Sequence, residues 1–79
     1  MKSYVIGLDL GTTSAKSIIF DPSGHVVGEH EVGYPLLHPQ NGYAEQDPST
    51  IEEAALEAMS LSKEAAGITA SEITGVGIS

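Results

Sequence analysis

The sequence contains no cysteine and no arginine, and its three lysines are set against eleven acidic residues. The absence of cysteine excludes disulfide bonds and thiolate metal sites. The formal net charge of −8 argues against nucleic acid and anionic membranes as partners, because both require a basic binding surface. A polyanionic ligand would therefore need a metal cation to screen its charge.

Long hydrophobic runs are lacking as well. The N-terminus carries one lysine and a short apolar run interrupted by Asp9, which suits neither a signal peptide nor a membrane span, so we expect a cytoplasmic protein. The 79 residues allow one small domain, although a chain of that size buries only about 60% of the surface that its unfolded form exposes. Because the chain stops inside a strand-like segment, residues 73–79, we expect it to be a piece of a longer protein.

Three strands are predicted in the first half of the chain. Residues 4–8 are continuously apolar, as in a central strand covered on both faces. Residues 14–20 suit a second strand, and a turn at 21–24 leads into a third strand at about 25–32. The side chains predicted to share one face of the second strand are Ala15, Ser17 and Ile19. Consecutive strands joined by tight turns form an antiparallel meander.

A connection rich in proline and glycine, residues 33–48, follows the third strand. Tyr34 and Tyr43 flank it, and we expect both to pin it to the body of the protein. Glu45 and Gln46 are typical of a sugar-binding cluster, but their position just before a helix favours a role in helix capping.

One helix is predicted after this connection. Asp47 can cap it with Pro48 as the first helical residue, and Ser49 with Glu52 offers an alternative capping box. Gly67 is expected to end the helix. A stripe of small and apolar residues can pack closely on a sheet, namely Ile51, Ala55, Ala58 and Ser62, with Ala54, Leu61 and Ala65 nearby.

The turn after the first strand combines groups that could bind phosphate. Asp9 stands at the strand end, Gly11 lets the backbone approach a ligand, and Lys16 supplies a positive charge on the returning strand. The hydroxyl residues of the turn are Thr12, Thr13 and Ser14. Such a turn can bind phosphate oxygens, and Asp9 would then hold Mg²⁺, through water. The same residues are equally typical of an ordinary hairpin turn, and spacing alone leaves both readings open.

The segment from Gly7 to Lys16, GLDLGTTSAK, resembles the first phosphate motif of the actin, Hsp70 and sugar kinase superfamily. The continuation is more selective, because FDPSGHVVGE, YPL and GYAEQDP resemble FGGY carbohydrate kinases in order and spacing. Within this family the sequence looks most like gluconokinases, with xylulokinases next. The resemblance covers essentially the whole chain.

This resemblance implies an α/β, actin-like ATPase (ribonuclease H-like) fold. Residues 1–79 would form the N-terminal, incomplete part of the first actin-like domain, with an antiparallel meander followed by a helix and a further strand. The implied activity is ATP-dependent phosphorylation of a sugar or sugar acid, with gluconate as the first candidate. The alternatives are a xylulokinase, an ATPase of the actin or Hsp70 type, and a stand-alone domain without enzymatic activity.

The resemblance also assigns roles to the turn. Asp9 would organise Mg²⁺, and Lys16 would take a basic position that several family members fill with arginine. The residues implied to bind the nucleotide are Gly11, Thr12, Thr13, Ser14 and Lys16. No catalytic residue is expected in this segment, because the family's catalytic aspartate lies later in the sequence. The rest of the kinase chain is the implied partner, and the oligomeric state stays open, a homodimer included.

Overall fold

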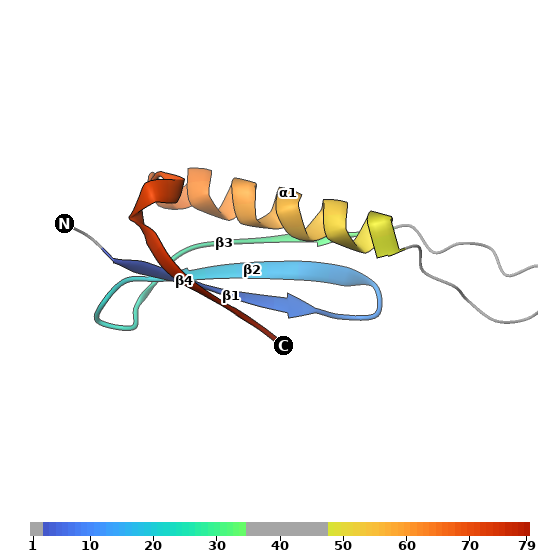
Figure 1. Ribbon diagram of the computed structural model, residues 1–79, viewed down its shortest axis with the longest axis horizontal. Helices are drawn as coiled ribbons and strands as arrows, with labels where there is room; N and C mark the ends of the chain where they lie inside the picture. The colour runs from blue at the N-terminus through green and yellow to red at the C-terminus, as the bar shows by residue number, and fades with distance from the viewer. Residues whose placement is uncertain (1–2, 35–47) are drawn as a thin grey trace, which may run out of the picture.

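A single helix packs against a four-stranded sheet in the computed structural model, which describes residues 3–34 and 48–79 (Figure 1). The elements are β1 (Tyr4–Leu10), β2 (Ser14–Phe20), β3 (Val26–Gly33), α1 (Pro48–Ala66), the short 3-10 helix η1 (Ala70–Glu72) and β4 (Ile73–Ile78). Strand order is β3-β2-β1-β4, with β1 antiparallel to β2, β2 antiparallel to β3, and β4 parallel to β1. The predicted meander, helix and further strand are confirmed.

The sheet has one covered face and one open face. Ala15, Ser17 and Ile19 of β2 are fully buried under α1, as the alternation in the sequence predicts. Val5 of β1 lies on the opposite face and is 45% exposed. The prediction that β1 is covered on both faces is therefore wrong for the described residues, because the single helix they contain covers one face only. β1 is nevertheless central in the sheet, between β2 and β4.

The helix approaches the sheet closely because small residues line the contact. The buried residues of α1 are Ala54, Ala55, Ala58 and Ser62, whereas Ala65, which the sequence placed near this stripe, is exposed. The hydroxyls of Ser17 and Ser62 form a buried hydrogen bond of 2.8 Å between β2 and α1. At Gly28 of β3, an added Cβ would lie 2.5 Å from the carbonyl oxygen of Ser62, so any larger residue there would push the helix away.

Both ends of α1 follow the sequence signals. The helix begins at Pro48, so Ser49 is already its second residue, and the predicted cap Asp47 lies outside the described residues. At the other end Gly67 has a φ of 70°, its N–H donates to the Glu64 carbonyl at 3.1 Å, and the Ile68 N–H donates to the carbonyl of residue 63 at 3.2 Å. This Schellman pattern confirms the predicted helix end. The part of the chain that the structure describes contains no helix long and apolar enough to cross a membrane.

The turn between β2 and β3 is closed by its own residues. The Gly24 N–H donates to the Asp21 carbonyl at 2.9 Å, and Gly24 has a φ of 88°, which favours glycine. The Asp21 carboxylate accepts hydrogen bonds of 2.9 Å from the backbone N–H groups of Ser23 and His25. The predicted Asp-Pro-Ser-Gly turn is therefore present, and it lies at the opposite end of β2 from the turn that follows β1 (Figure 1).

Candidate functional site

The turn between β1 and β2 brings the predicted phosphate-binding residues together. The Gly11 N–H donates to the Ser14 carbonyl at 2.9 Å, which leaves Thr12 and Thr13 at the exposed tip. A Cβ added to Gly11 would lie 3.3 Å from the same carbonyl oxygen, which explains why a residue without a side chain suits this position. The turn is thus tight, and Thr12 and Thr13 are exposed at its tip.

A row of alternating charges crosses three strands beside this turn. Asp9 of β1 lies directly opposite Lys16 of β2, and Lys16 lies directly opposite Glu31 of β3. Paired positions share a face of the sheet, and this face is the one that α1 leaves open. Asp9 is exposed and Lys16 half-buried. The predicted metal-binding carboxylate and the predicted phosphate-binding lysine are therefore neighbours.

Glu31 belongs to the site, although sequence reasoning did not find it. The Ser14 hydroxyl donates to a Glu31 carboxylate oxygen at 2.5 Å. A hydroxyl has one proton, so in this arrangement the Ser14 side chain offers further ligands only acceptor lone pairs. Among the hydroxyl residues of the turn, the Ser14 side chain is therefore engaged with the protein itself. The sequence alone does not reveal the contact between Ser14 and Glu31, because it depends on the register between β2 and β3, which places Ser14 opposite Gly33.

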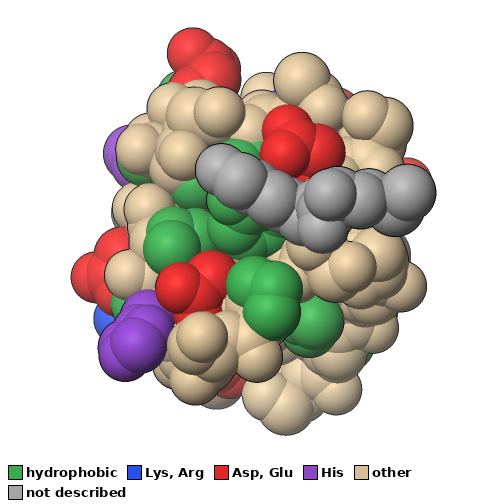
Figure 2. Space-filling model, turned by 90° about the vertical axis from the view of Figure 1, so that its left-hand side faces the viewer, with side chains coloured by type: hydrophobic (Ala, Val, Ile, Leu, Met, Phe, Trp, Pro, Cys, Tyr) green, Lys and Arg blue, Asp and Glu red, His purple; other side chains and the backbone are tan. Residues whose placement is uncertain are grey.

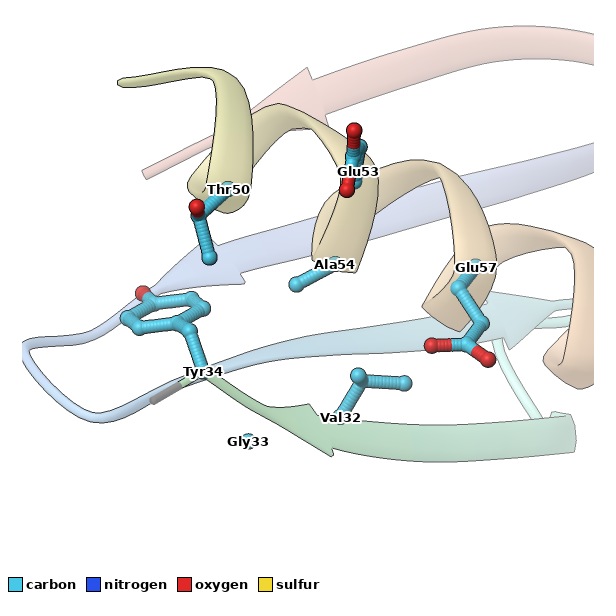
Figure 3. Close-up of a pocket in the computed structure, with 7 residues that line it drawn as sticks. All are labelled: Val32, Gly33, Tyr34, Thr50, Glu53, Ala54 and Glu57. Atoms are coloured by element: carbon cyan, nitrogen blue, oxygen red, sulfur yellow. The ribbon is translucent and has the colours of Figure 1, made fainter. Parts of the chain in front are cut away.

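Tyr34 contacts the turn from the side of the helix. Its hydroxyl is hydrogen-bonded to the carbonyl oxygens of Gly11 and Ser14, the latter at 2.8 Å, and its backbone N–H donates to the Thr13 carbonyl at 3.0 Å. The ring is 6% exposed and lies under the first turns of α1, next to Ala54 (Figure 3). Tyr34 was expected to pin the connection to the body of the protein, and its buried ring agrees with this, while its hydroxyl contacts with the turn were not predicted. Tyr43, predicted to do the same, lies outside the described residues.

A hollow of about 420 Å³ extends from Asp9 along β1 and β4. Gly7 of β1 and Gly77 of β4 lie side by side, and the hollow stays open above them because neither residue has a side chain. Ile18 and Phe20 form its apolar wall on β2. The candidate site therefore has a carboxylate at the edge of a mainly apolar recess.

The donor set fits Mg²⁺ carried by a nucleotide better than a metal held by protein alone. Among the described residues, no group of three or more histidine, cysteine or acidic side chains could hold a metal ion. Mg²⁺ is commonly bound by one or two carboxylates together with water and substrate phosphates. Asp9, exposed near the end of β1 and paired with Lys16, is a carboxylate of this kind.

The described residues thus form an α/β sheet in which a tight turn joins the two central strands, with Asp9 and Lys16 paired beside it. The profile described as "FGGY family of carbohydrate kinases, N-terminal domain" matches residues 4–79. The chain belongs to the FGGY family of carbohydrate kinases. This confirms the family resemblance that the sequence motifs indicate.

Curated relatives include kinases for three different substrates. The gluconokinase of Bacillus subtilis (strain 168) is 45% identical over 56 residues, which are 71% of this chain and 11% of the relative. A xylulose kinase of Staphylococcus xylosus is 44% identical over 57 residues, 72% of this chain and 12% of the relative. A glycerol kinase of Thermococcus gammatolerans is 36% identical over 78 residues, 99% of this chain and 16% of the relative. The chain thus spans a small part of the length of these relatives.

A solved structure supports the same fold. The gluconate kinase of Lactobacillus acidophilus superposes on the whole of this chain with a TM-score of 0.84 and 34% sequence identity, and the match covers 15% of that kinase. The α/β class and the actin-like architecture expected from the sequence are confirmed by this likeness and by the family match.

Proposed function

We propose that the complete protein containing this chain transfers the γ-phosphoryl group of ATP to a hydroxyl group of a sugar or sugar acid. The observation that carries this proposal is the pairing of Asp9 with Lys16 directly beside the Gly11–Ser14 turn. Phosphoryl transfer depends mainly on positioning and on charge stabilisation. This segment supplies part of the charge stabilisation, within a family of carbohydrate kinases.

Each residue of the turn has a distinct role in the proposal. The proposed nucleotide-binding residues are Gly11, Thr12, Thr13, Ser14 and Lys16. Asp9 would hold Mg²⁺ through water, and the ion, when bound, would neutralise charge on the phosphate oxygens. Lys16 adds a single positive charge, without the bidentate geometry that an arginine would provide. Because the Ser14 hydroxyl already donates its proton to Glu31, Ser14 would bind phosphate through its backbone N–H.

Gluconate is the substrate we favour, with 6-phosphogluconate as product. The support is the 45% identity to a gluconokinase and the superposition on a gluconate kinase. Xylulose and glycerol are the alternatives, since kinases named for them match at 44% and 36% identity. We expect the general base and most sugar contacts outside these 79 residues, so the chain by itself should be inactive.

The rest of the kinase chain is the partner we propose for the uncovered surface. A groove of about 320 Å³ lies between α1 and β4, and Leu56 and Val76 on its walls are 55% and 52% exposed. Ile78 of β4 is 67% exposed. Hydrophobic side chains also gather at the surface of the end that faces the viewer in Figure 2. Apolar surface of this kind indicates a contact with further protein. A cytoplasmic location and a homodimer stay predictions.

The test is a coupled ADP-release assay on the complete protein with Mg²⁺-ATP and gluconate, xylulose or glycerol. Strong stimulation by one compound would support the kinase and identify its substrate. ADP release that is independent of all sugars would overturn the proposal in favour of an ATPase of the actin or Hsp70 type. A cooperative thermal transition of the isolated 79-residue chain would instead support a stand-alone domain, whereas association through the β4 edge would argue against one.

A further inference from the structure

We propose that Tyr34 is a positioning residue for the nucleotide, because it orients the peptide groups of the Gly11–Ser14 turn. This inference rests on the proposed function of the turn as a phosphate loop. Tyr34 follows β3 directly and lies 20 residues beyond Ser14, yet it bonds to three of the four residues of the turn. Its phenol has one proton, which the carbonyls of Gly11 and Ser14 share.

The direction of these hydrogen bonds decides what the turn presents to a ligand. The Gly11 and Thr13 carbonyls point towards Tyr34, and in a trans peptide the N–H lies opposite the C=O. The N–H groups of Thr12 and Ser14 therefore point away from Tyr34. Phosphate oxygens accept hydrogen bonds from N–H groups and are repelled by carbonyl oxygens. Tyr34 thus keeps the repelling ends of these peptides turned away from the proposed phosphate site.

Burial makes this arrangement rigid. The ring packs with Leu8, Ala15 and Ala54 in the core cluster between the sheet and α1, and only 6% of the residue is exposed. Figure 3 shows the ring between the start of α1 and the β1–β2 turn. A hydroxyl held by a packed ring loses little further entropy when a ligand binds. The turn is therefore shaped before the nucleotide arrives.

The experiment compares Tyr34→Phe with Tyr4→Phe in the complete kinase. Tyr4 is the matched control, because it is a buried tyrosine, 8% exposed, at the start of β1 and outside the phosphate turn. Loss of one net hydrogen bond should raise the KM for ATP by about twofold to tenfold in Tyr34→Phe. The KM for the sugar should stay unchanged, and kcat should fall less than the KM for ATP rises. A purely structural role would lower the active fraction, and so kcat, without changing the KM for ATP.

A second measurement does not depend on turnover. Hydrogen exchange of the peptide covering residues 9–16, without nucleotide, should be faster in Tyr34→Phe and unchanged in Tyr4→Phe. The affinity for Mg²⁺-ATP, measured by equilibrium dialysis, should fall in Tyr34→Phe alone. If exchange and affinity respond while no sugar stimulates the wild-type protein, the proposed kinase activity fails and the role of Tyr34 stands. Unchanged exchange or unchanged ATP affinity in Tyr34→Phe would overturn the inference.

Discussion

The two turns at the ends of β2 hold their shapes in different ways. In the turn at residues 21–24, the Asp21 carboxylate accepts hydrogen bonds from the N–H groups of Ser23 and His25, both at 2.9 Å. In the Gly11–Ser14 turn, a backbone bond from Gly11 to Ser14 is joined by the hydroxyl and N–H of Tyr34, beyond the end of β3. The first turn is stabilised by its own side chain, and the second by a residue distant in sequence.

This difference separates a structural turn from the turn that we propose to bind phosphate. The carboxylate of Asp21 is occupied by the backbone of its own turn, so the side chain is part of the fold. At the other end, Tyr34 bonds to the backbone of the turn, and Thr12 and Thr13 at its tip are exposed, as is Asp9 on β1. A turn held from behind can therefore keep its shape while its side chains face solvent.

The largest expected effect is on kcat, and it distinguishes Asp9 beside the proposed site from Asp21 in the structural turn. In the complete kinase, Asp9→Ala or Thr13→Val should lower kcat by on the order of 10²-fold or more, because metal and phosphate positioning are lost. Asp21→Asn, at the structural turn, should leave kcat within about twofold, since ordinary surface changes far from a site cost little. Steady-state kinetics with saturating ATP and sugar measures both. Unchanged kcat in Asp9→Ala and Thr13→Val would refute the assignment of the site.

The next effect concerns Lys16, beside the turn that we propose to bind phosphate. Lys16→Gln should lower kcat/KM for ATP by about tenfold to a hundredfold, the value of one hydrogen bond to a charged group. Lys63→Gln is the control, because Lys63 is the other half-buried lysine among the described residues and lies in the last turn of α1. Equal losses in the two variants would show that general electrostatics, and no local contact, is responsible.

A smaller effect, on the free energy of unfolding and on the KM for ATP, distinguishes Gly24 from Gly11. Gly24→Ala should lower the free energy of unfolding by about 1 kcal/mol, because alanine disfavours the φ of 88° found there. Gly11→Ala should cost less stability, since Gly11 has no positive φ, and it should raise the KM for ATP by displacing the Ser14 carbonyl that lies 3.3 Å from the new Cβ. Urea denaturation and kinetics of the two variants measure this. The contrast fails if Gly24→Ala changes the KM for ATP and Gly11→Ala does not.

The smallest effect is a pH dependence confined to the structural turn. The backbone N–H of His25 above all, with that of Ser23, holds the pKa of Asp21 below its ordinary value. A lowered pKa in the folded state means that the stabilisation is present above the unfolded value of about 4 and is lost as the pH falls through the folded value. Hydrogen exchange of residues 21–25, corrected for intrinsic rates, should therefore speed up on acidification below about pH 4. In Asp21→Asn the same peptide should show no such pH dependence.

Much of the local structure could be predicted from residue patterns. Strand β2 has the predicted bounds, Ser14–Phe20, because its alternating pattern is set by the strand period itself. The third strand, expected at 25–32, is Val26–Gly33, a shift of one residue. The short helix η1, whose three residues carry little pattern, was not predicted. Confirmation of Gly67 as the helix end shows how strong a glycine signal is at that position.

The supports of the candidate site could not be predicted in the same way. The sequence indicated Asp9, Gly11, Lys16 and the hydroxyl residues of the turn, and the structure places them together. Glu31 and the hydroxyl contacts of Tyr34 were missed, because both depend on how β3 aligns with β2. Nothing in the spacing of Glu31 along its own strand reveals which residue of the neighbouring strand it will meet.

The sequence by itself determined the family, the order of the helices and strands, and which residues form the two turns of the meander. Each of these depends on residues close together along the chain. Only the tertiary structure decided that β4 joins the free edge of β1, that α1 covers one face, and that Tyr34 supports the Gly11–Ser14 turn. The physical reason is that such contacts join residues far apart in sequence. They depend on strand register and on packing between layers, which no local pattern specifies.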